Sequence, residues 1–415
     1  MNLFNYHHGE LFCEDLPISR IAETAGTPFY LYSKNTLLRH YRRFDDSLAG
    51  IGHIICFAFK ANSSLAILKI LADAGSGADV VSGGELYRAL RVGIPPGRIV
   101  FNGNAKTEEE IKAALDCDIL MFNIDSESEL NLLSRFAGQM GRRARVALRV
   151  NPDIDPRTHP YISTGLKENK FGIPIEHALE FYKQAAEMPN IEVVGIHKHI
   201  GSQIVELSPF IESLERVVGL VTELNRLGLG IRYMDMGGGI GITYNDEEPP
   251  SFEEYVGAVR PLIETCRCTL IVEPGRVIVG NAGILVTRIL HVKSTGRKTF
   301  VVVDAAMNDL IRPSIYGAYH QIVPVRRREG DAKKIVADVV GGICESADFF
   351  ARGRELPELE AGELIAIMSA GAYGSTMSSN YNSRPLIAEV MVNGTQLKVI
   401  RRRQTFDEMV ALESF

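Results

Sequence analysis

A single lysine ends an apolar stretch, "IICFAFKAN" at residues 54–62, that otherwise has the composition of a buried strand. Lysine is rarely buried without a partner, because removing an ammonium group from water costs free energy. An apolar setting would lower the pKa of Lys60 and leave its amine free to attack a carbonyl carbon. The alternative is a core lysine whose ammonium group reaches solvent. Lys60 is therefore a candidate nucleophile that needs support from other residues.

Two histidines stand two positions apart in "GIHKHIGSQ" at residues 195–203, with Ser202 in the turn that follows. The period of a strand places His197 and His199 on one face, and it turns Lys198 toward the helices. The two rings could ligate a metal ion, although no third ligand is evident nearby, and an imidazole could also stack on a flat cofactor. Core histidines with satisfied hydrogen bonds are an equal alternative.

Three consecutive glycines, Gly237, Gly238 and Gly239, end another apolar run in "MDMGGGIG" at residues 234–241. Glycine lets the backbone approach a phosphate closely and present its N–H groups as donors. The run is not the dinucleotide-binding fingerprint, because Ile242 occupies the third glycine position. It indicates either a phosphate-binding turn or a tight turn without a ligand.

A carboxylate and an arginine lie close together in "VEPGR" at residues 272–276. Glu273 could hold a proton on a ring nitrogen, and Arg276, after Pro274 and Gly275, could bind a carboxylate through two hydrogen bonds. A simple Glu–Arg pair is the alternative. A reactive amine, an imidazole, a glycine turn and a carboxylate are together the groups that hold pyridoxal phosphate, and this joint occurrence favours that cofactor over a metal ion.

Eight short apolar runs, separated by amphipathic helical segments, are positioned to carry these residues. They cover residues 54–61, 77–82, 98–103, 118–125, 145–152, 193–201, 233–239 and 269–276. Eight strand–helix units predict a (β/α)8, TIM-like barrel, in which the catalytic side chains lie at the carboxyl ends of the strands. The polar residues at those ends should converge on one mouth: Lys60, Ser82, Asn102, Asn123, Asp125, Arg149, Asn151, His197, His199, Asp235, Glu273 and Arg276.

From residue 281 onward the pattern changes to strand-like runs with turn residues between them, which predicts a β-rich C-terminal domain. The strand-like segment "TPFYLYS" near the N-terminus could join either domain. We place the barrel at residues 31–280 and the β-rich domain at residues 1–30 and 281–415.

Composition indicates an ordinary globular protein of 415 residues, 46% hydrophobic and 23% charged, with a formal net charge of −6. No basic surface for nucleic acid is evident, and we expect no membrane contact because no apolar run has the length of a bilayer. Six scattered cysteines are typical of reduced thiols, and the start of the sequence lacks a signal peptide, so we predict a cytoplasmic location.

With these motifs in view, the sequence resembles the fold-type III pyridoxal-phosphate decarboxylases, whose fold is that of alanine racemase. It resembles most the branch that decarboxylates meso-2,6-diaminopimelate to L-lysine and carbon dioxide, the last step of lysine biosynthesis. The resemblance runs from "TPFYLYS" to "NYNSRPLIAEV". It implies pyridoxal 5'-phosphate as cofactor, an amino acid as substrate, and a homodimer with shared active sites.

The resemblance also implies roles for individual residues. Lys60 would form the Schiff base, His199 would stack on the cofactor ring and Glu273 would face the pyridine nitrogen. The phosphate would be bound by Ser202, Gly238, Gly239, Gly275 and Arg276.

In "GGICESADFF", Cys344 would be the proton donor and Glu345 a ligand for the distal amino group, both entering the partner subunit's site. Arg276, Arg312 and Tyr316 would bind the distal carboxylate, and Tyr373 would reach cofactor and substrate. Without that motif, a lone cysteine is more often a buried structural thiol.

Two other functions remain open from the sequence. One is a decarboxylase of the same fold that acts on ornithine, arginine or carboxynorspermidine, although two arginines argue for a substrate with a distal carboxylate. The other is a cofactor-carrying or regulatory barrel without turnover, against which the presence of Lys60, Cys344 and Glu345 argues.

Overall fold

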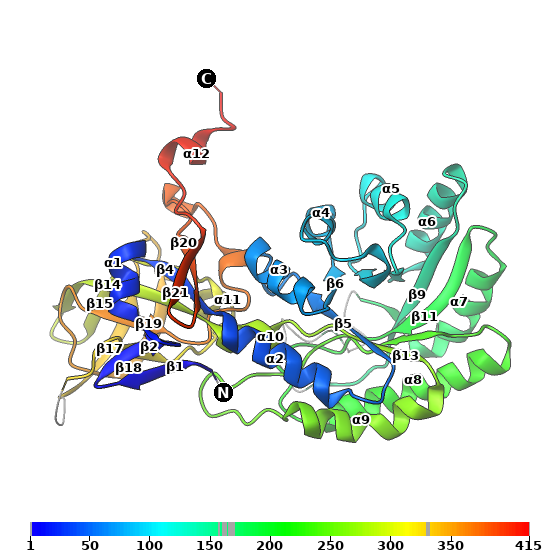
Figure 1. The fold of residues 1–415 in the computed structure, drawn as a ribbon, viewed down its shortest axis with the longest axis horizontal. Coiled ribbons are helices and arrows are strands. Elements are labelled where there is room, and N and C mark those ends of the chain that lie inside the picture. Colours follow the sequence, from blue (N-terminus) through cyan, green and yellow to red (C-terminus); the bar gives the residue numbers. More distant parts are fainter. Residues whose placement is uncertain (1, 157, 160–163, 165–170, 329–332, 415) are drawn as a thin grey trace. The chain divides into compact units, whose positions relative to one another are not determined.

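The computed structural model describes residues 2–156, 158–159, 164, 171–328 and 333–414, and it divides into two compact units. The barrel unit comprises Tyr41–Ile242 and Glu248–Val277. The β unit comprises Met1–His40, Thr243–Glu247 and Ile278–Phe415. Figure 1 labels the helices and strands of both units.

Eight parallel strands of the barrel unit close on themselves in the order β5-β6-β7-β8-β9-β11-β12-β13, with β13 pairing back to β5. Their bounds are β5 His53–Ala58, β6 Gly77–Val80, β7 Ile99–Phe101, β8 Met121–Ile124, β9 Ala144–Asn151, β11 Ile191–His197, β12 Tyr233–Asp235 and β13 Thr269–Val272. The two-residue strand β10 (Ile173–Pro174) adds to β9. The predicted barrel and all eight of its strands are confirmed.

Helix α2 precedes the first barrel strand, and a helix follows each of the eight strands, as connections between parallel strands require. Their bounds are α2 Lys34–Ser47, α3 Leu65–Asp73, α4 Gly83–Arg91, α5 Glu108–Cys117, α6 Glu127–Gln139, α7 Ile175–Glu187, α8 Ser208–Arg226, α9 Phe252–Cys266 and α10 Arg276–Val279, with a 3-10 turn at Pro96–Arg98. Four of these helices begin with Ser or Thr followed three positions later by Glu, and in each the hydroxyl accepts from the Glu N–H. This N-cap satisfies backbone donors that a helix start leaves unpaired.

Inside the barrel, an apolar cluster gives way to polar side chains toward the carboxyl ends of the strands. The apolar cluster includes Cys56, Val100, Met121 and Ile271. The polar side chains Asp79, Asn123, His197 and Asp235 are almost completely buried. Because buried polar groups need hydrogen-bond partners, this layer must be internally connected.

The β unit contains two sheets and a few short helices. A three-stranded sheet has the order β1-β2-β3, and a larger sheet has the order β18-β17-β15-β14-β4-β20-β21, with β19 pairing to β14 and β16. The strands are β1 Phe4–His7, β2 Glu10–Cys13, β3 Leu16–Pro17, β4 Phe29–Ser33, β14 Gly283–Ser294, β15 Thr299–Val303, β16 Ile322–Pro324, β17 Lys334–Val340, β18 Phe349–Pro357, β19 Leu364–Ile367, β20 Ala388–Asn393 and β21 Gln396–Arg401. The helices are α1 Ile18–Ala25, α11 Arg312–Tyr316 and α12 Phe406–Val410, with 3-10 turns at Gly280–Ala282, Ser375–Met377 and Tyr381–Ser383.

The N-terminal strand-like segment, which the sequence left open, lies in the β unit. It forms β4, which pairs antiparallel with β14 and parallel with β20. The predicted division between residues 30 and 31 falls within β4, and the domain boundaries stay a prediction.

Among the described residues, no helix combines the length and apolar character needed to cross a bilayer.

Candidate active site

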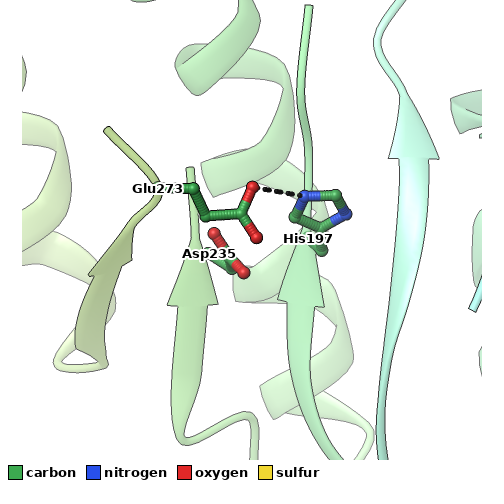
Figure 2. Close-up of side chains that lie close together, drawn as sticks. All are labelled: His197, Asp235 and Glu273. Carbon is green, nitrogen blue, oxygen red and sulfur yellow. Dashed lines mark ion pairs between the residues drawn. The ribbon is translucent and has the colours of Figure 1, made fainter. Parts of the chain in front are cut away.

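Three side chains from neighbouring strands meet at the carboxyl end of the barrel interior. His197 ends β11 and pairs in register with Asp235, which ends β12. Because paired positions of a parallel sheet share a face, the two side chains enter the interior together. Glu273 follows β13, and its Oε2 lies 3.6 Å from His197 Nε2, an ion pair when the imidazole is protonated (Figure 2).

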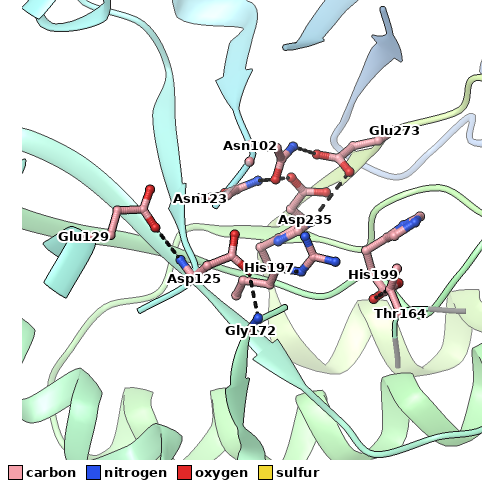
Figure 3. A network of polar contacts seen from close by, with 12 residues as sticks. Asn102, Asn123, Asp125, Glu129, Thr164, Gly172, His197, His199, Asp235 and Glu273 are labelled. Atoms are coloured by element: carbon pink, nitrogen blue, oxygen red, sulfur yellow. Dashed lines mark hydrogen bonds and ion pairs between the residues drawn. The ribbon is translucent and has the colours of Figure 1, made fainter. Parts of the chain in front are cut away.

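Two asparagines connect the buried carboxylates around this mouth (Figure 3). The Asn102 amide donates to Asp79 Oδ1 at 2.7 Å and also to Glu273 Oε1. The Asn123 amide donates to Asn102 Oδ1 at 2.9 Å and to Asp235 Oδ2 at 3.0 Å. A continuous hydrogen-bonded network therefore crosses the barrel, which confirms that these polar strand ends converge.

Within this network the pKa values of Asp235 and Glu273 shift in opposite directions. Burial raises the pKa of Asp235 well above its ordinary value, and the nearby Glu273 carboxylate raises it further. Burial acts in the same direction on Glu273, but the His197 imidazole and the Lys60 ammonium outweigh it and lower the pKa of Glu273. The pair therefore favours the proton on Asp235 and the negative charge on Glu273 at the mouth.

Lys60 lies two residues beyond β5, and its ammonium group forms a salt bridge with Asp79 on β6. The register places Ala58 beside Asp79, so the two side chains emerge close together. The Lys60 side chain is 37% exposed, whereas that of Asp79 is completely buried. The apolar surroundings predicted for Lys60 are thus wrong: its partner is a carboxylate, which favours the charged ammonium.

Asp79 itself was not among the residues that the sequence pointed to. Burial raises its pKa, Glu273 adds to the rise, and Lys60 opposes it. The available signal was an acidic residue inside the otherwise apolar strand "GADV". An ionisable residue at such a position is a functional-site candidate.

His199 lies beyond the end of β11, because the strand is shorter than predicted. Its Nδ1 accepts from the Gly238 N–H at 3.2 Å. Burial lowers the pKa of His199 well below its ordinary value, and the positive charges of Arg149 and Lys60 add to the effect. The ring is therefore a neutral imidazole at the mouth.

The glycine turn packs too tightly for other residues. A Cβ on Gly238 would lie 2.2 Å from the Glu273 carbonyl oxygen, and Gly239 has a φ of +119°. Beside the turn, the buried Arg276 donates from Nη2 to Ser202 Oγ at 3.0 Å. A Cβ on Gly275 would lie 2.8 Å from that of Ala61. Ser202, Arg276 and the glycines thus form one donor-rich surface of the barrel unit.

The remaining predicted residues belong to the β unit. Arg312 and Tyr316 begin and end helix α11, and Arg312 is buried. Tyr373 has a φ of +55°, an uncommon conformation for a residue other than glycine. A side chain held in this way is oriented by the structure around it, which fits a functional position.

Cys344 and Glu345 are both exposed, so a buried structural thiol is excluded for Cys344. A second loop supports them: the Tyr381 hydroxyl donates to Glu345 Oε2 at 2.8 Å, and Asn382 Oδ1 accepts from the Cys344 N–H at 3.3 Å. Tyr381 did not stand out in the sequence, because no local pattern relates positions 345 and 381.

The mouth also contains a group of side chains of the kind that binds metal ions. Within the described part of the chain, ligand atoms of His197, Asp235 and Glu273 lie within 4.8 Å of one another. This differs from the His197–His199 pair that the sequence suggested. One oxygen of each carboxylate already accepts from an asparagine, and Asp235 Oδ1 accepts from the Gly237 N–H. These hydrogen bonds therefore stabilise the two buried carboxyl groups without a cation. The absence of a metal stays a prediction.

Comparison with known proteins gives consistent matches over the whole chain. A family model described as the pyridoxal binding domain of pyridoxal-dependent decarboxylases matches residues 34–280. The diaminopimelate decarboxylase of Pseudomonas aeruginosa is 50% identical over 414 residues, covering 100% of this chain and 99% of that protein. The one from Aquifex aeolicus is 49% identical over 406 residues, covering 98% and 96%.

Solved structures agree with these relatives. The diaminopimelate decarboxylase of Helicobacter pylori, complexed with L-lysine, has a TM-score of 0.91 and 43% identity, covering 95% of this chain and 98% of that one. The enzyme of M. jannaschii, also in complex with L-lysine, has a TM-score of 0.94 and 40% identity, covering 99% and 98%.

Proposed function

This chain belongs to the diaminopimelate decarboxylases of the pyridoxal-dependent decarboxylase family, and we propose on that premise that it converts meso-2,6-diaminopimelate to L-lysine and carbon dioxide, the last step of lysine biosynthesis. The observation that carries the proposal is the chain of contacts from Lys60 through Asp79 and Asn102 to Glu273. It brings an amine and an ionised carboxylate to one barrel mouth.

The residues at this mouth fit pyridoxal phosphate. Lys60 offers a primary amine for the aldehyde, the ionised Glu273 offers an acceptor for a pyridinium N–H, and the neutral His199 offers a flat ring. Arg276 and Ser202 offer donors for a phosphate beside the glycine turn. When bound, pyridoxal phosphate supplies the ring that takes up the electrons left behind when carbon dioxide departs.

The site residues of the barrel unit orient Lys60 and bind the cofactor. Asp79 stabilises the proton on Lys60 Nζ and orients that atom. Glu273 keeps the ring nitrogen protonated, and its charge is preserved because the proton of the buried pair lies on Asp235. Gly238, Gly239 and Gly275 let the backbone approach the phosphate.

Arg276 of the barrel unit and several residues of the β unit select and protonate the substrate. Arg276, Arg312 and Tyr316 bind the carboxylate of the L-configured centre, and Glu345 binds the amino group there. Tyr373 reaches cofactor and substrate. Cys344 Sγ delivers a proton to the carbon that loses carbon dioxide. A substrate without the distal carboxylate would lose its ion pairs with these arginines, so it would bind more weakly.

We place Cys344 and Glu345 in the partner subunit's site, so that the protein acts as a homodimer. Their exposure supports this placement, since a buried loop could not serve another chain. Lys60→Ala and Cys344→Ala homodimers should each be severely impaired. After subunit exchange, a heterodimer should recover up to about half of a dimer's activity, because a two-fold interface repeats each site twice. Demonstrated exchange without recovered activity would place the thiol within one chain.

The cytoplasmic location inferred from the sequence stays a prediction, which cell fractionation tests. We likewise expect no binding to nucleic acid or membranes.

Carbon dioxide release from meso-diaminopimelate, measured beside ornithine, arginine and carboxynorspermidine, tests the function. We expect turnover of meso-diaminopimelate to exceed the others by orders of magnitude. Faster turnover of any of the three would assign the protein to that substrate instead, and no turnover with any of the four would favour a carrier or regulatory barrel.

A further inference from the structure

A histidine at the end of the "RPSIYGAYH" segment holds the guanidinium group of Arg312. His320 Nε2 lies 2.9 Å from Arg312 Nη1, and His320 Nδ1 lies 2.8 Å from the Met368 carbonyl oxygen. His320 is completely buried, and Arg312 is only 6% exposed. Both ring nitrogens therefore have partners of known hydrogen-bonding character.

These partners determine the state of the ring. A guanidinium N–H can only donate, so Nε2 must be an unprotonated acceptor. A carbonyl oxygen can only accept, so Nδ1 must carry the hydrogen. His320 is therefore a neutral imidazole of the Nδ1–H tautomer, and it orients Arg312 without adding a negative charge beside it.

An aromatic ring completes the arrangement. The Arg312 guanidinium carbon lies 4.8 Å from the centre of the Tyr244 ring, a cation–π contact. The same ring meets His320 edge to face, with centroids 5.2 Å apart and planes at 81°. The backbone N–H of Tyr244 donates to Glu247 Oε2 at 2.9 Å. The hydrogen bond to His320 and the contact with the Tyr244 ring both orient the guanidinium group.

We propose that His320 is a positioning residue that sets substrate selectivity by holding Arg312 through a neutral acceptor, so that the guanidinium keeps its full attraction for a substrate carboxylate. A carboxylate in place of His320 would hold Arg312 equally well but would cancel its charge. The inference rests on the proposed function, in which Arg312 binds the carboxylate of the L-configured centre. L-lysine, the product, keeps that carboxylate, whereas cadaverine lacks it.

Three substitutions distinguish the effect of the acceptor's position from the effect of its charge. His320→Gln places an amide oxygen where Nε2 lies and keeps the acceptor for Arg312. His320→Asn reaches only the Nδ1 position, so it keeps the bond to Met368 and loses the acceptor. His320→Glu keeps the reach of glutamine but adds a negative charge.

The experiment measures competitive inhibition of the holoenzyme by L-lysine and by cadaverine, together with kcat and KM for meso-diaminopimelate. For Asn and Glu we expect L-lysine inhibition to weaken and KM to rise by about tenfold or more, the usual effect of losing a hydrogen bond or a charge at a charged group. Inhibition by cadaverine and kcat should stay within about threefold. The Gln variant should resemble the wild type in all four quantities.

The proposal would be overturned if the Asn and Glu variants lost inhibition by L-lysine and by cadaverine equally. It would also be overturned if these two variants behaved like the wild type. Thermal unfolding shows which variants fold, and the Gln–Glu pair decides the matter if the Asn variant does not. The wild-type arm tests the proposed function separately. Absence of carbon dioxide release there refutes that function, whereas an active wild type with three indistinguishable variants refutes only the role of His320.

Discussion

Replacing Lys198 by methionine should stabilise the protein and remove part of its pH dependence. Lys198 follows β11 directly and is almost completely buried. Its Nζ donates to Ser213 Oγ on α8 at 2.9 Å and lies 5.7 Å from the centre of the Phe210 ring. Burial lowers the pKa of Lys198 to about 7, and the nearby Asp235 acts in the opposite direction.

The magnitude follows from the displacement of this pKa from 10.5 to about 7. At about 1.4 kcal/mol per unit, the buried ammonium costs about 5 kcal/mol as an upper limit. Replacing buried charges by well-packed apolar side chains commonly stabilises by about 1–4 kcal/mol, and methionine fills nearly the same volume. Ser213 keeps a partner, because its hydroxyl also donates to the Phe210 carbonyl at 3.0 Å. We expect Lys198→Met to stabilise by about 1–3 kcal/mol at pH 7.

The sign of the pH dependence follows from the same pKa. Between about pH 7 and the ordinary lysine value, the folded chain binds fewer protons than the unfolded chain, so its stability rises with pH. The penalty is fully present below about pH 7 and fades toward pH 10. The variant should therefore gain most at pH 6 and very little at pH 10.

Urea unfolding followed by circular dichroism at pH 6, 7, 8, 9 and 10 measures this difference. Lys69→Met is the matched control, because Lys69 is exposed and pairs with Asp73 one helical turn away; its effect should stay below about 0.5 kcal/mol. Activity should be unchanged in both. A gain for Lys198→Met that is absent at pH 6, or equally large at pH 10, would refute the reasoning.

Three further predictions concern single residues. Glu273→Gln should retain the cofactor, seen by its visible absorbance, but slow decarboxylation by about 100-fold or more, because a neutral amide no longer keeps the ring nitrogen protonated; an unchanged rate contradicts this. Burial raises the pKa of Glu85 to about 7, so stability falls as pH rises from about 4.5 to 7. Glu85→Gln should abolish this fall in thermal unfolding between pH 5 and 8, and a persisting fall would exclude Glu85 as its source. Tyr381→Phe should raise KM about threefold or more with kcat unchanged, because Glu345 loses a hydrogen bond; the exposed Tyr87 provides the control Tyr87→Phe, which should have no effect.

The barrel could be predicted because its strands and helices are indicated by residues that lie close together in the sequence. Short apolar runs and the amphipathic helical segments between them recur along the chain, and both patterns depend on residues a few positions apart. The predicted strands ran too far at their carboxyl ends, as at His199, because polar residues there line the mouth after the ladder has ended. The strand period did turn Lys198 toward the helices, where it meets Ser213.

The partners of the site residues could not be predicted, because they depend on contacts between distant segments. Asp79 meets Lys60 only through the register of β5 and β6, and Tyr381 meets Glu345 only once two loops are folded together. His320 lies eight residues from Arg312, but its role required knowing that its other nitrogen faces a carbonyl. Such pairings change the chemistry of a site, but no local sequence motif indicates them.

We propose that Lys60 is the lysine that holds the cofactor. Two lysines that are buried in the described part of the chain provide internal rivals. The Lys106 Nζ donates to the Gly103 carbonyl at 2.6 Å and the Asn123 carbonyl at 2.9 Å, and the Lys198 Nζ donates to Ser213 on helix α8. Borohydride reduction of the holoenzyme fixes the cofactor covalently, and peptide mapping by mass spectrometry then locates it. We predict the label on the peptide containing Lys60 and its loss in Lys60→Ala. A label on Lys106 or Lys198, or no label on an active enzyme, would contradict the account.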